Sequence, residues 1–193
     1  MTRRVPFAWF ARNIVVGALL GGGYGAIHDQ VSWSISPEYF TKFKFEQFAW
    51  ADLGLEPRLA ASWIGFLATW WAGAIAAYVV SRMAFRHAYG QGASGWPLAR
   101  VVHRLLVVLA IAMAGGVCGF AFARIRAPDV DRLWGGWRTY GGVQNLEAFA
   151  TVGSIHNFGY AGALLGIVLV ALHIKRQGRV DRSSPEGLPP PVR

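Results

Sequence analysis

The sequence predicts an all-α integral membrane protein: a four-helix bundle with a short amphipathic helix at the membrane surface after its first span. Three observations predict this class. Hydrophobic residues make up 54% of the 193 residues and mean hydropathy is +0.33, whereas soluble domains are roughly 45–50% apolar. The apolar residues gather in four runs, near the ~20 residues that a helix needs to cross a bilayer. Lys and Arg flank these runs, which is typical of membrane proteins.

The first span is predicted over about residues 8–27. Its apolar core, Asn13–Ile27, is short for a span, and Phe7–Ala11 extends it if the side chain of Arg12 reaches along the helix to the membrane surface. A cleaved signal peptide is the competing interpretation, because a basic start precedes an apolar core. The region after the core has no small-residue cleavage pattern, since Tyr24 stands at one of the required positions. This favours a retained span.

Three glycines, Gly17, Gly21 and Gly25, lie four residues apart and therefore on one face of this span. Because they carry no side chains, another helix can approach this face closely. We expect a helix of the same bundle, a second copy of the chain or another membrane protein to pack there, and the lipid bilayer to cover the outer faces.

The segment that follows, residues 31–59, is too polar to span a membrane. Within it, Ser36, Pro37 and Glu38 supply an N-cap, a first-turn proline and a first-turn acid, which together predict a helix start. The helix is expected over about residues 37–50. It is rich in aromatic residues, so we expect it to lie at the membrane surface or to fold back over the bundle.

Three further spans are predicted over about residues 60–80, 101–123 and 150–173. A basic loop separates the second span from the third, and a second polar loop separates the third from the fourth. Residues 1–175 are then one membrane domain. Residues 176–193 are expected to form a basic tail whose Pro-rich end lacks ordered structure.

Positive charge divides unequally between the two sides of the predicted bundle. The side of the termini holds twelve Lys and Arg, namely Arg3, Arg4, Arg12, Arg82, Arg86, Arg100, Arg104, Lys175, Arg176, Arg179, Arg182 and Arg193. The opposite side holds seven, namely Lys42, Lys44, Arg58, Arg124, Arg126, Arg132 and Arg138. Because the side richer in Lys and Arg stays in the cytoplasm, both termini are predicted to be cytoplasmic.

Composition also excludes several classes of function. The net charge of +9 and the pI of about 10.4 would suggest nucleic-acid binding in a soluble protein. Here the charges flank spans, so we expect no nucleic-acid partner. The single cysteine, Cys118, excludes a disulfide within the chain and a cysteine-based metal cluster. It lies in an apolar run, where we interpret it as a small buried residue.

Ionisable residues gather where the first and fourth spans meet the outer surface. His28 closes the first span, and His156 opens the fourth from the same side. Burying ionisable groups inside a membrane costs free energy, so residues of this kind usually indicate a functional site. The predicted metal ligands are His28, Asp29, Glu38, Glu46 and His156. Imidazole with carboxylate suits zinc, iron, copper or manganese, and helix bundles build such sites from facing helices.

Other uses of these residues stay open. Two facing histidines are suited to axial ligation of haem b, and the cluster is also suited to proton relay or quinone contact. A structural polar cluster is a further alternative, because the helix dipole alone explains Glu38, and Lys42 and Glu46 are spaced for a helix-surface ion pair. His103 and His173, at the inner ends of the spans, are interpreted as ordinary membrane-flanking residues.

The leading functional hypothesis is a membrane protein with a polar outer-leaflet site that binds a metal or serves redox or proton chemistry. A structural or assembly subunit of a larger membrane complex is the alternative from another class. A small transporter is the third, although the first three spans have no ionisable residue at mid-depth. Whether the protein is an enzyme stays open, and no catalytic residue is assigned, because the sequence contains no recognised catalytic motif.

The block HDQVSWSISPEYFTKFKFEQF, within Tyr24–Phe48, resembles one found in a group of bacterial multi-span membrane proteins. Those proteins carry a similar HDQ…SPEYFTKFKF…QF block after their first span. The resemblance implies that the block is a folding or functional signature, and it carries over no activity and no catalytic residue. We therefore expect the bacterial inner membrane as the location.

Overall fold

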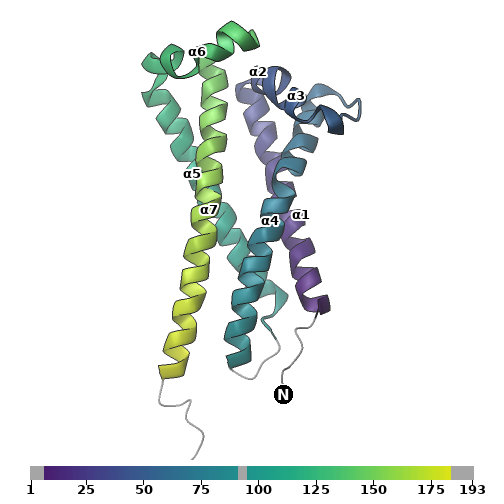
Figure 1. The fold of residues 1–193 in the computed structure, drawn as a ribbon, viewed down its shortest axis with the longest axis vertical. Helices are drawn as coiled ribbons and strands as arrows, with labels where there is room; N and C mark the ends of the chain where they lie inside the picture. The colour runs from purple at the N-terminus through teal and green to yellow at the C-terminus, as the bar shows by residue number, and fades with distance from the viewer. Residues whose placement is uncertain (1–6, 91–94, 184–193) are drawn as a thin grey trace, which may run out of the picture.

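Four long helices form the body of the protein (Figure 1). The computed structural model describes residues 7–90 and 95–183, and within these ranges it contains helices and loops but no strand. The long helices are α1 (Phe7–Ile35), α4 (Pro57–Gly90), α5 (Leu98–Ile125) and α7 (Leu146–Ser183). The prediction of an all-α helical bundle is confirmed.

Each long helix is apolar and long enough to cross a membrane. The four candidate spans are Phe7–Ile35, Pro57–Ala88, Leu98–Ile125 and Leu146–Gly178. The chain is therefore a multi-pass membrane protein, with spans that extend past the predicted bounds. The start of α1 and the end of α7 lie at the same end of the bundle, while the short helices gather at the other end (Figure 1).

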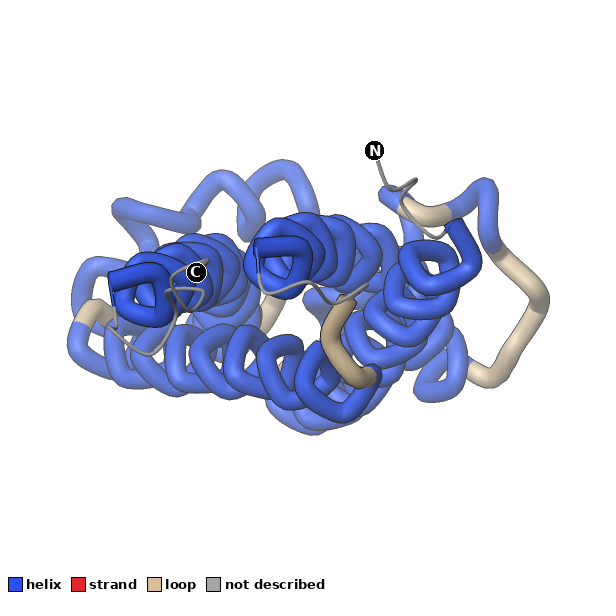
Figure 2. The backbone as a smooth tube through the Cα atoms, turned by 90° about the horizontal axis from the view of Figure 1, so that it is seen from below, coloured by secondary structure: helices blue, strands red, loops and turns tan. Residues whose placement is uncertain are grey.

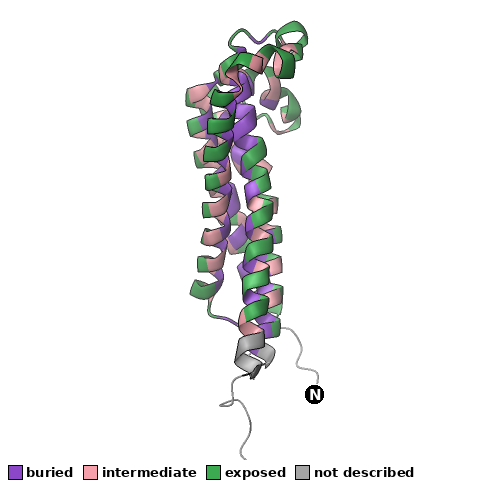
Figure 3. Cartoon of the chain, turned by 90° about the vertical axis from the view of Figure 1, so that its left-hand side faces the viewer, coloured by how far each residue is buried: buried purple, intermediate pink, exposed green. Residues whose placement is uncertain are grey.

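Exposed residues cover the outer faces of the long helices, and buried residues line the inner faces (Figure 3). Figure 2 views the molecule from below Figure 1 and shows the long helices packed side by side. This is the arrangement expected when lipid covers the outside and helix packing fills the inside.

Helix α1 continues past the predicted end of the first span and takes in His28 and Asp29. The first span was predicted to end at about residue 27, before both residues, and the structure extends the helix to Ile35. The helix stops at Ser36, whose backbone is extended (φ −147°, ψ 96°), because Pro37 disfavours helical geometry at the residue before it. The Ser36 hydroxyl accepts a hydrogen bond from the Tyr39 N–H at 3.3 Å, so this residue is the predicted N-cap.

The glycine face of α1 packs against α4 of the same chain. A methyl group at Gly21 would lie 2.8 Å from Cα of Gly73 and 2.9 Å from the carbonyl oxygen of Thr69. Gly17 and Gly25 approach the α4 backbone just as closely. The Thr69 hydroxyl also donates a hydrogen bond to the Gly21 carbonyl at 2.8 Å. Of the three expected neighbours of this face, a helix of the same bundle is the one that the structure contains.

Helices α5 and α7 form a second close pair. A methyl group at Gly162 of α7 would lie 3.2 Å from Cα of Ala112, and Gly119 of α5 touches the backbone of Ser154. Cys118, beside Gly119, is exposed on the outer surface of α5. The prediction that Cys118 is buried is wrong, because only the neighbouring glycine face of α5 turns toward α7.

The predicted surface helix over residues 37–50 is present in a broken form. It consists of α2 (Pro37–Tyr39), the π-helical turn η1 (Phe40–Lys44), α3 (Phe45–Gln47) and the 3-10 turn η2 (Ala49–Ala51). We call residues 37–51 the capping segment, since they fold over the end of the bundle opposite the termini (Figure 1). Tyr39 and Phe40 are buried there with Phe149 of α7.

Glu38 fastens the capping segment to the start of α7. Its carboxylate oxygens accept hydrogen bonds from the backbone N–H groups of Gln144 at 3.0 Å and Asn145 at 2.8 Å. The Asn145 side chain in turn caps α7 by accepting a hydrogen bond from the Ala148 N–H at 3.1 Å. A negative group is stabilised at this helix end by the helix dipole.

The polar loop predicted between the third and fourth spans contains a helix. After the 3-10 turn η3 (Ala127–Asp129), α6 (Val130–Gly141) runs across the top of the bundle (Figure 1). Trp137 of α6 packs on Phe149, with ring centroids 4.9 Å apart. Gly142 ends α6 with φ +62°, which glycine adopts without strain and which is a common helix stop.

Helix α7 continues to Ser183, past the predicted domain boundary at residue 175. The first part of the predicted tail is therefore helical. Its remainder, residues 184–193, lies outside the described residues, as do Arg3 and Arg4.

Replacing Gly21 by valine is expected to destabilise the α1–α4 pair by about 1–3 kcal/mol, because the new side chain meets the α4 backbone. The matched control is Gly23→Val, where a side chain would meet nothing within 4 Å. Thermal unfolding in detergent, followed by circular dichroism, measures both. Equal stability of the two variants would contradict the packing described above.

Replacing Glu38 by glutamine is expected to weaken the attachment of the capping segment to α7 by about 0.5–2 kcal/mol, since the charge at the helix start is lost. Hydrogen exchange of the Gln144 and Asn145 amides should become faster. Glu46→Gln serves as control, because Glu46 is exposed on α3. Unchanged exchange at both amides in Glu38→Gln would refute this role.

Candidate metal centre

Helices α1 and α7 bring three potential metal ligands together near the capped end of the bundle. His28 and Asp29 come from α1, and His156 comes from α7. One ligand atom from each residue lies within 4.8 Å of the other two. Asp29 and His156 are buried and His28 is half-buried. The group therefore lies inside the bundle. Two of its members are adjacent in sequence, and the third comes from a distant helix.

Asp29 and His156 are joined by a hydrogen bond. His156 Nε2 lies 3.0 Å from Asp29 Oδ1, and each side chain is only 4% exposed. On the other side of the ring, Nδ1 lies 2.9 Å from the carbonyl oxygen of Val152. A carbonyl only accepts, so Nδ1 carries a hydrogen and donates it. Nε2 is therefore the nitrogen that faces the carboxylate and that is left to share a proton or to bind a metal.

Aromatic rings surround the group and fix its orientation. The His28 and His156 rings meet edge to face with centroids 4.9 Å apart. Tyr24, one turn before His28, stacks on it at 5.5 Å, and Tyr39 of the capping segment stacks on His156 at 5.0 Å. Tyr160, one turn after His156, contacts the same ring at 6.0 Å. The imidazoles are thus held by packing on several sides.

The negative charge of Asp29 affects the pKa of two residues in the capping segment, Lys44 and Tyr39. Burial lowers the pKa of the Lys44 ammonium, and attraction to Asp29 partly offsets this. Lys44 Nζ lies 5.0 Å from the centre of the Phe43 ring and donates a hydrogen bond to Gln47 Oε1 at 2.9 Å. Burial raises the pKa of the Tyr39 phenol, and Tyr160 and Asp29 raise it further. Tyr39 therefore remains a neutral phenol at pH 7.

The structure brings together three of the five predicted ligands. Glu38 binds backbone amides at the start of α7, and Glu46 is exposed on α3, so neither belongs to the group. Gln30, next to Asp29, bonds instead to Ser62 of α4, with Nε2 2.6 Å from Oγ. The physical reason is the break at Ser36, which turns the capping segment so that its acids point away from the histidines.

Sequence reasoning missed the residues that line the group. Tyr24 and Tyr160 stand four positions from His28 and His156, so each lies on the same helix face as its histidine. That spacing was a usable signal for both. Nothing comparable identified Tyr39 or Lys44, because their places depend on how the capping segment folds over α7.

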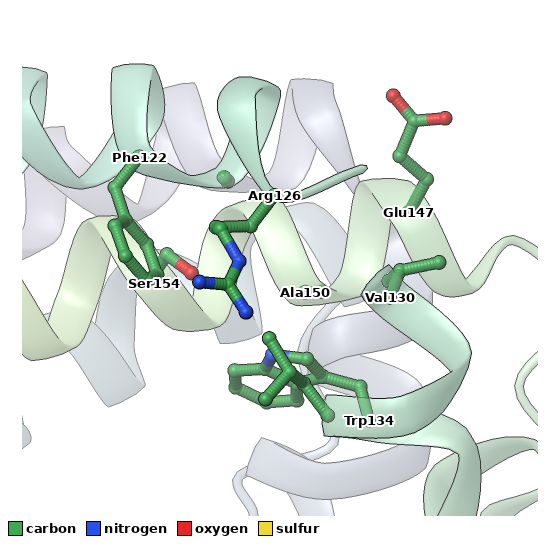
Figure 4. Close-up of a pocket in the computed structure, with 9 residues that line it drawn as sticks. Phe122, Arg126, Val130, Trp134, Glu147, Ala150 and Ser154 are labelled. Carbon is green, nitrogen blue, oxygen red and sulfur yellow. The ribbon is translucent and has the colours of Figure 1, made fainter. Parts of the chain in front are cut away.

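A separate small cavity lies between the end of α5, α6 and α7. It is lined by Phe122, Ala123, Arg126, Val130, Leu133, Trp134, Glu147, Ala150 and Ser154. Figure 4 shows the Arg126 guanidinium between Phe122, Ser154 and Trp134. Arg126 forms an ion pair with Asp129 at 2.9 Å, and Glu147 pairs with Arg124. These charges are compensated locally, and the cavity is not lined by His28, Asp29 or His156.

No protein family, no curated protein and no solved structure gives a match to this chain. The resemblance of the Tyr24–Phe48 block to bacterial membrane proteins therefore stays a prediction. What the site can do follows from its geometry alone.

The Asp29–His156 bond is expected to contribute a coupling free energy of about 1–3 kcal/mol, because removing either partner leaves the other buried without it. A double-mutant cycle with Asp29→Ala and His156→Ala, measured by unfolding in detergent, gives this value. The control cycle uses Glu46→Ala and His173→Ala, both at exposed residues. A coupling near zero for Asp29 and His156 would show that the bond does not hold α1 to α7.

Proposed function

We propose that this chain is a metal-binding membrane protein whose bundle holds one transition-metal ion between His28, Asp29 and His156. The observation that carries the proposal is the convergence of two imidazoles and one carboxylate within 4.8 Å. Two histidines and one carboxylate are the ligand set of catalytic zinc sites and of non-haem iron(II) sites. The ion proposed is therefore of the zinc or iron(II) class.

Distances within the group support this choice. Metal–ligand bonds of ~2.0–2.2 Å at tetrahedral angles put neighbouring donor atoms about 3.3–3.6 Å apart. Asp29 Oδ1 and His156 Nε2 are 3.0 Å apart, close to that value. A metal between them would replace the proton that they share, and a ligand atom of His28 lies within 4.8 Å of both.

The bond from His156 Nδ1 to the Val152 carbonyl gives further support. Metal-binding histidines almost always donate their second ring N–H to a carbonyl or a carboxylate, which fixes the tautomer and aims the free nitrogen at the metal. His156 has this partner before any metal is bound. The ligand is thus oriented in advance by the helix that carries it.

The same geometry favours a single ion over haem b. In a bis-histidine haem the two imidazoles stand on opposite faces of the porphyrin ring. Here the His28 and His156 rings touch each other edge to face, with centroids 4.9 Å apart. Insertion of a porphyrin between them would require α1 and α7 to separate.

Proton chemistry without a metal is the second candidate function, and the 3.0 Å contact between Asp29 and His156 favours it. One proton lies between Nε2 and the carboxylate, and moving it converts an ion pair into a neutral pair. Such a pair inside a span is suited to holding and passing a proton. Metal analysis distinguishes the two candidates.

The proposed location is the bacterial inner membrane, with both termini in the cytoplasm. Support comes from the excess of Lys and Arg on the side of the termini and from the even number of candidate spans. With this orientation, the metal centre lies near the outer surface. Asp29 is six residues before the end of α1, about 9 Å along the helix axis.

The purified full-length protein is expected to bind close to one zinc or iron ion per chain, and His28→Ala, Asp29→Ala and His156→Ala should each lower the metal affinity at least about tenfold, because each removes one ligand. Elemental analysis and metal titration of the detergent-solubilised protein provide the measurement. His103→Ala and His173→Ala are the controls and should bind like the wild type, since both histidines are exposed.

A visible absorption spectrum of the same samples tests for haem. Wild-type protein that binds no zinc or iron ion would refute the proposal and leave the proton pair as the better account. Equal loss of metal in the ligand variants and in the exposed-histidine controls would also refute it, because binding would then be nonspecific.

A further inference from the structure

We propose that the metal centre keeps one coordination position open for a small exchangeable anion, hydroxide in water, and that the hydroxyl of Tyr24 is the hydrogen-bond donor to it. This inference rests on the proposed function, because it concerns a ligand of the same metal ion. It identifies the centre as reactive rather than structural, since structural zinc sites are closed by four protein ligands.

The first observation is the number of ligands. In the described part of the chain, the group contains three ligand residues, and a zinc or iron(II) ion takes four or more. Glu38 and Glu46 do not complete the set, because Glu38 is bound to α7 amides and Glu46 is exposed. A ligand from outside the protein would therefore occupy the remaining position.

The second observation is independent of the ligand number. The Tyr24 hydroxyl is buried, and it has no hydrogen-bond partner among the described residues. Buried hydroxyl groups nearly always have a partner, so the Tyr24 hydroxyl is a donor available to a ligand held at this group. The Tyr24 ring stacks on His28 and its oxygen interacts electrostatically with Asp29, so this hydroxyl borders the metal centre.

Neighbouring charges and the available space restrict the class of ligand. Lys44 is a buried cation in the capping segment that interacts with Asp29, so it favours an additional negative charge at the centre. Ring packing favours a ligand of few atoms, because ring centroids lie 5.5 Å apart for Tyr24 and His28, 4.9 Å for His28 and His156, and 5.0 Å for His156 and Tyr39. Hydroxide meets both conditions, and azide is a suitable probe because it is small, anionic and accepts hydrogen bonds.

The test is azide titration of the full-length protein loaded with cobalt(II), whose visible spectrum reports a change of ligand. Wild-type protein should give a saturable change with one azide per cobalt. Tyr24→Phe retains the ring that stacks on His28 and removes only the hydroxyl, so azide binding should weaken about tenfold, as expected for the loss of one hydrogen bond to a charged ligand. Its cobalt affinity should stay within about threefold of the wild type.

The control is Tyr78→Phe, which removes a hydroxyl from the exposed surface of α4 and should leave azide binding unchanged. Azide that does not alter the wild-type spectrum, or that binds Tyr24→Phe as tightly as the wild type, overturns the inference while leaving the metal site in place. Loss of cobalt affinity in Tyr24→Phe overturns it as well, because Tyr24 would then be needed for the site itself. Wild-type protein that fails to bind cobalt overturns both the inference and the proposed function.

Discussion

The buried hydrogen bond between Asp29 and His156 links the two halves of this protein. Helix α1 packs on α4 through glycines, and α5 packs on α7 in the same way. Each pair is held together by close backbone contact, and in the α1–α4 pair hydrogen bonds such as that from Thr69 to Gly21 add to it. The Asp29–His156 bond is a different kind of contact, because it joins α1 to α7 across the pairs. A carboxylate at this depth is costly unless it is paired, so the position of one pair relative to the other determines whether the charge is satisfied.

The capping segment protects this bond from the membrane surface. Its first turn is attached to α7 through Glu38, and it places Tyr39 on the His156 ring. Phe40 beside it is completely buried. A π-helical turn follows at Phe40–Lys44, a feature that often accompanies functional sites because it displaces side chains from regular helical register. The capping segment thus covers one end of the bundle. It also supplies Tyr39, which packs on the His156 ring.

In the proposed function, a proton and a metal ion would compete for the same atom, Nε2 of His156. His156 Nδ1 is committed to the Val152 carbonyl, so only Nε2 is available to either. An ion bound to Nε2 would displace the proton shared with Asp29, as expected when a protonated group becomes a metal ligand. The two candidate functions are linked by this exchange. If both proposals hold, uptake of an ion and release of a proton would be coupled at this group.

The sequence by itself determined the class of the protein, the four spans and the helix start at Ser36, because hydropathy, length and capping are local properties. It also indicated that His28, Asp29 and His156 belong together, from their places at the ends of two spans. The sequence did not predict the features that depend on contacts between distant parts of the chain. Only the tertiary structure separated Glu38 and Glu46 from the histidines, because the direction of the capping segment depends on its contacts with α7. It also decided that α1 continues through Asp29, since a charged residue remains in a buried helix only when its partner, here His156, arrives from another helix.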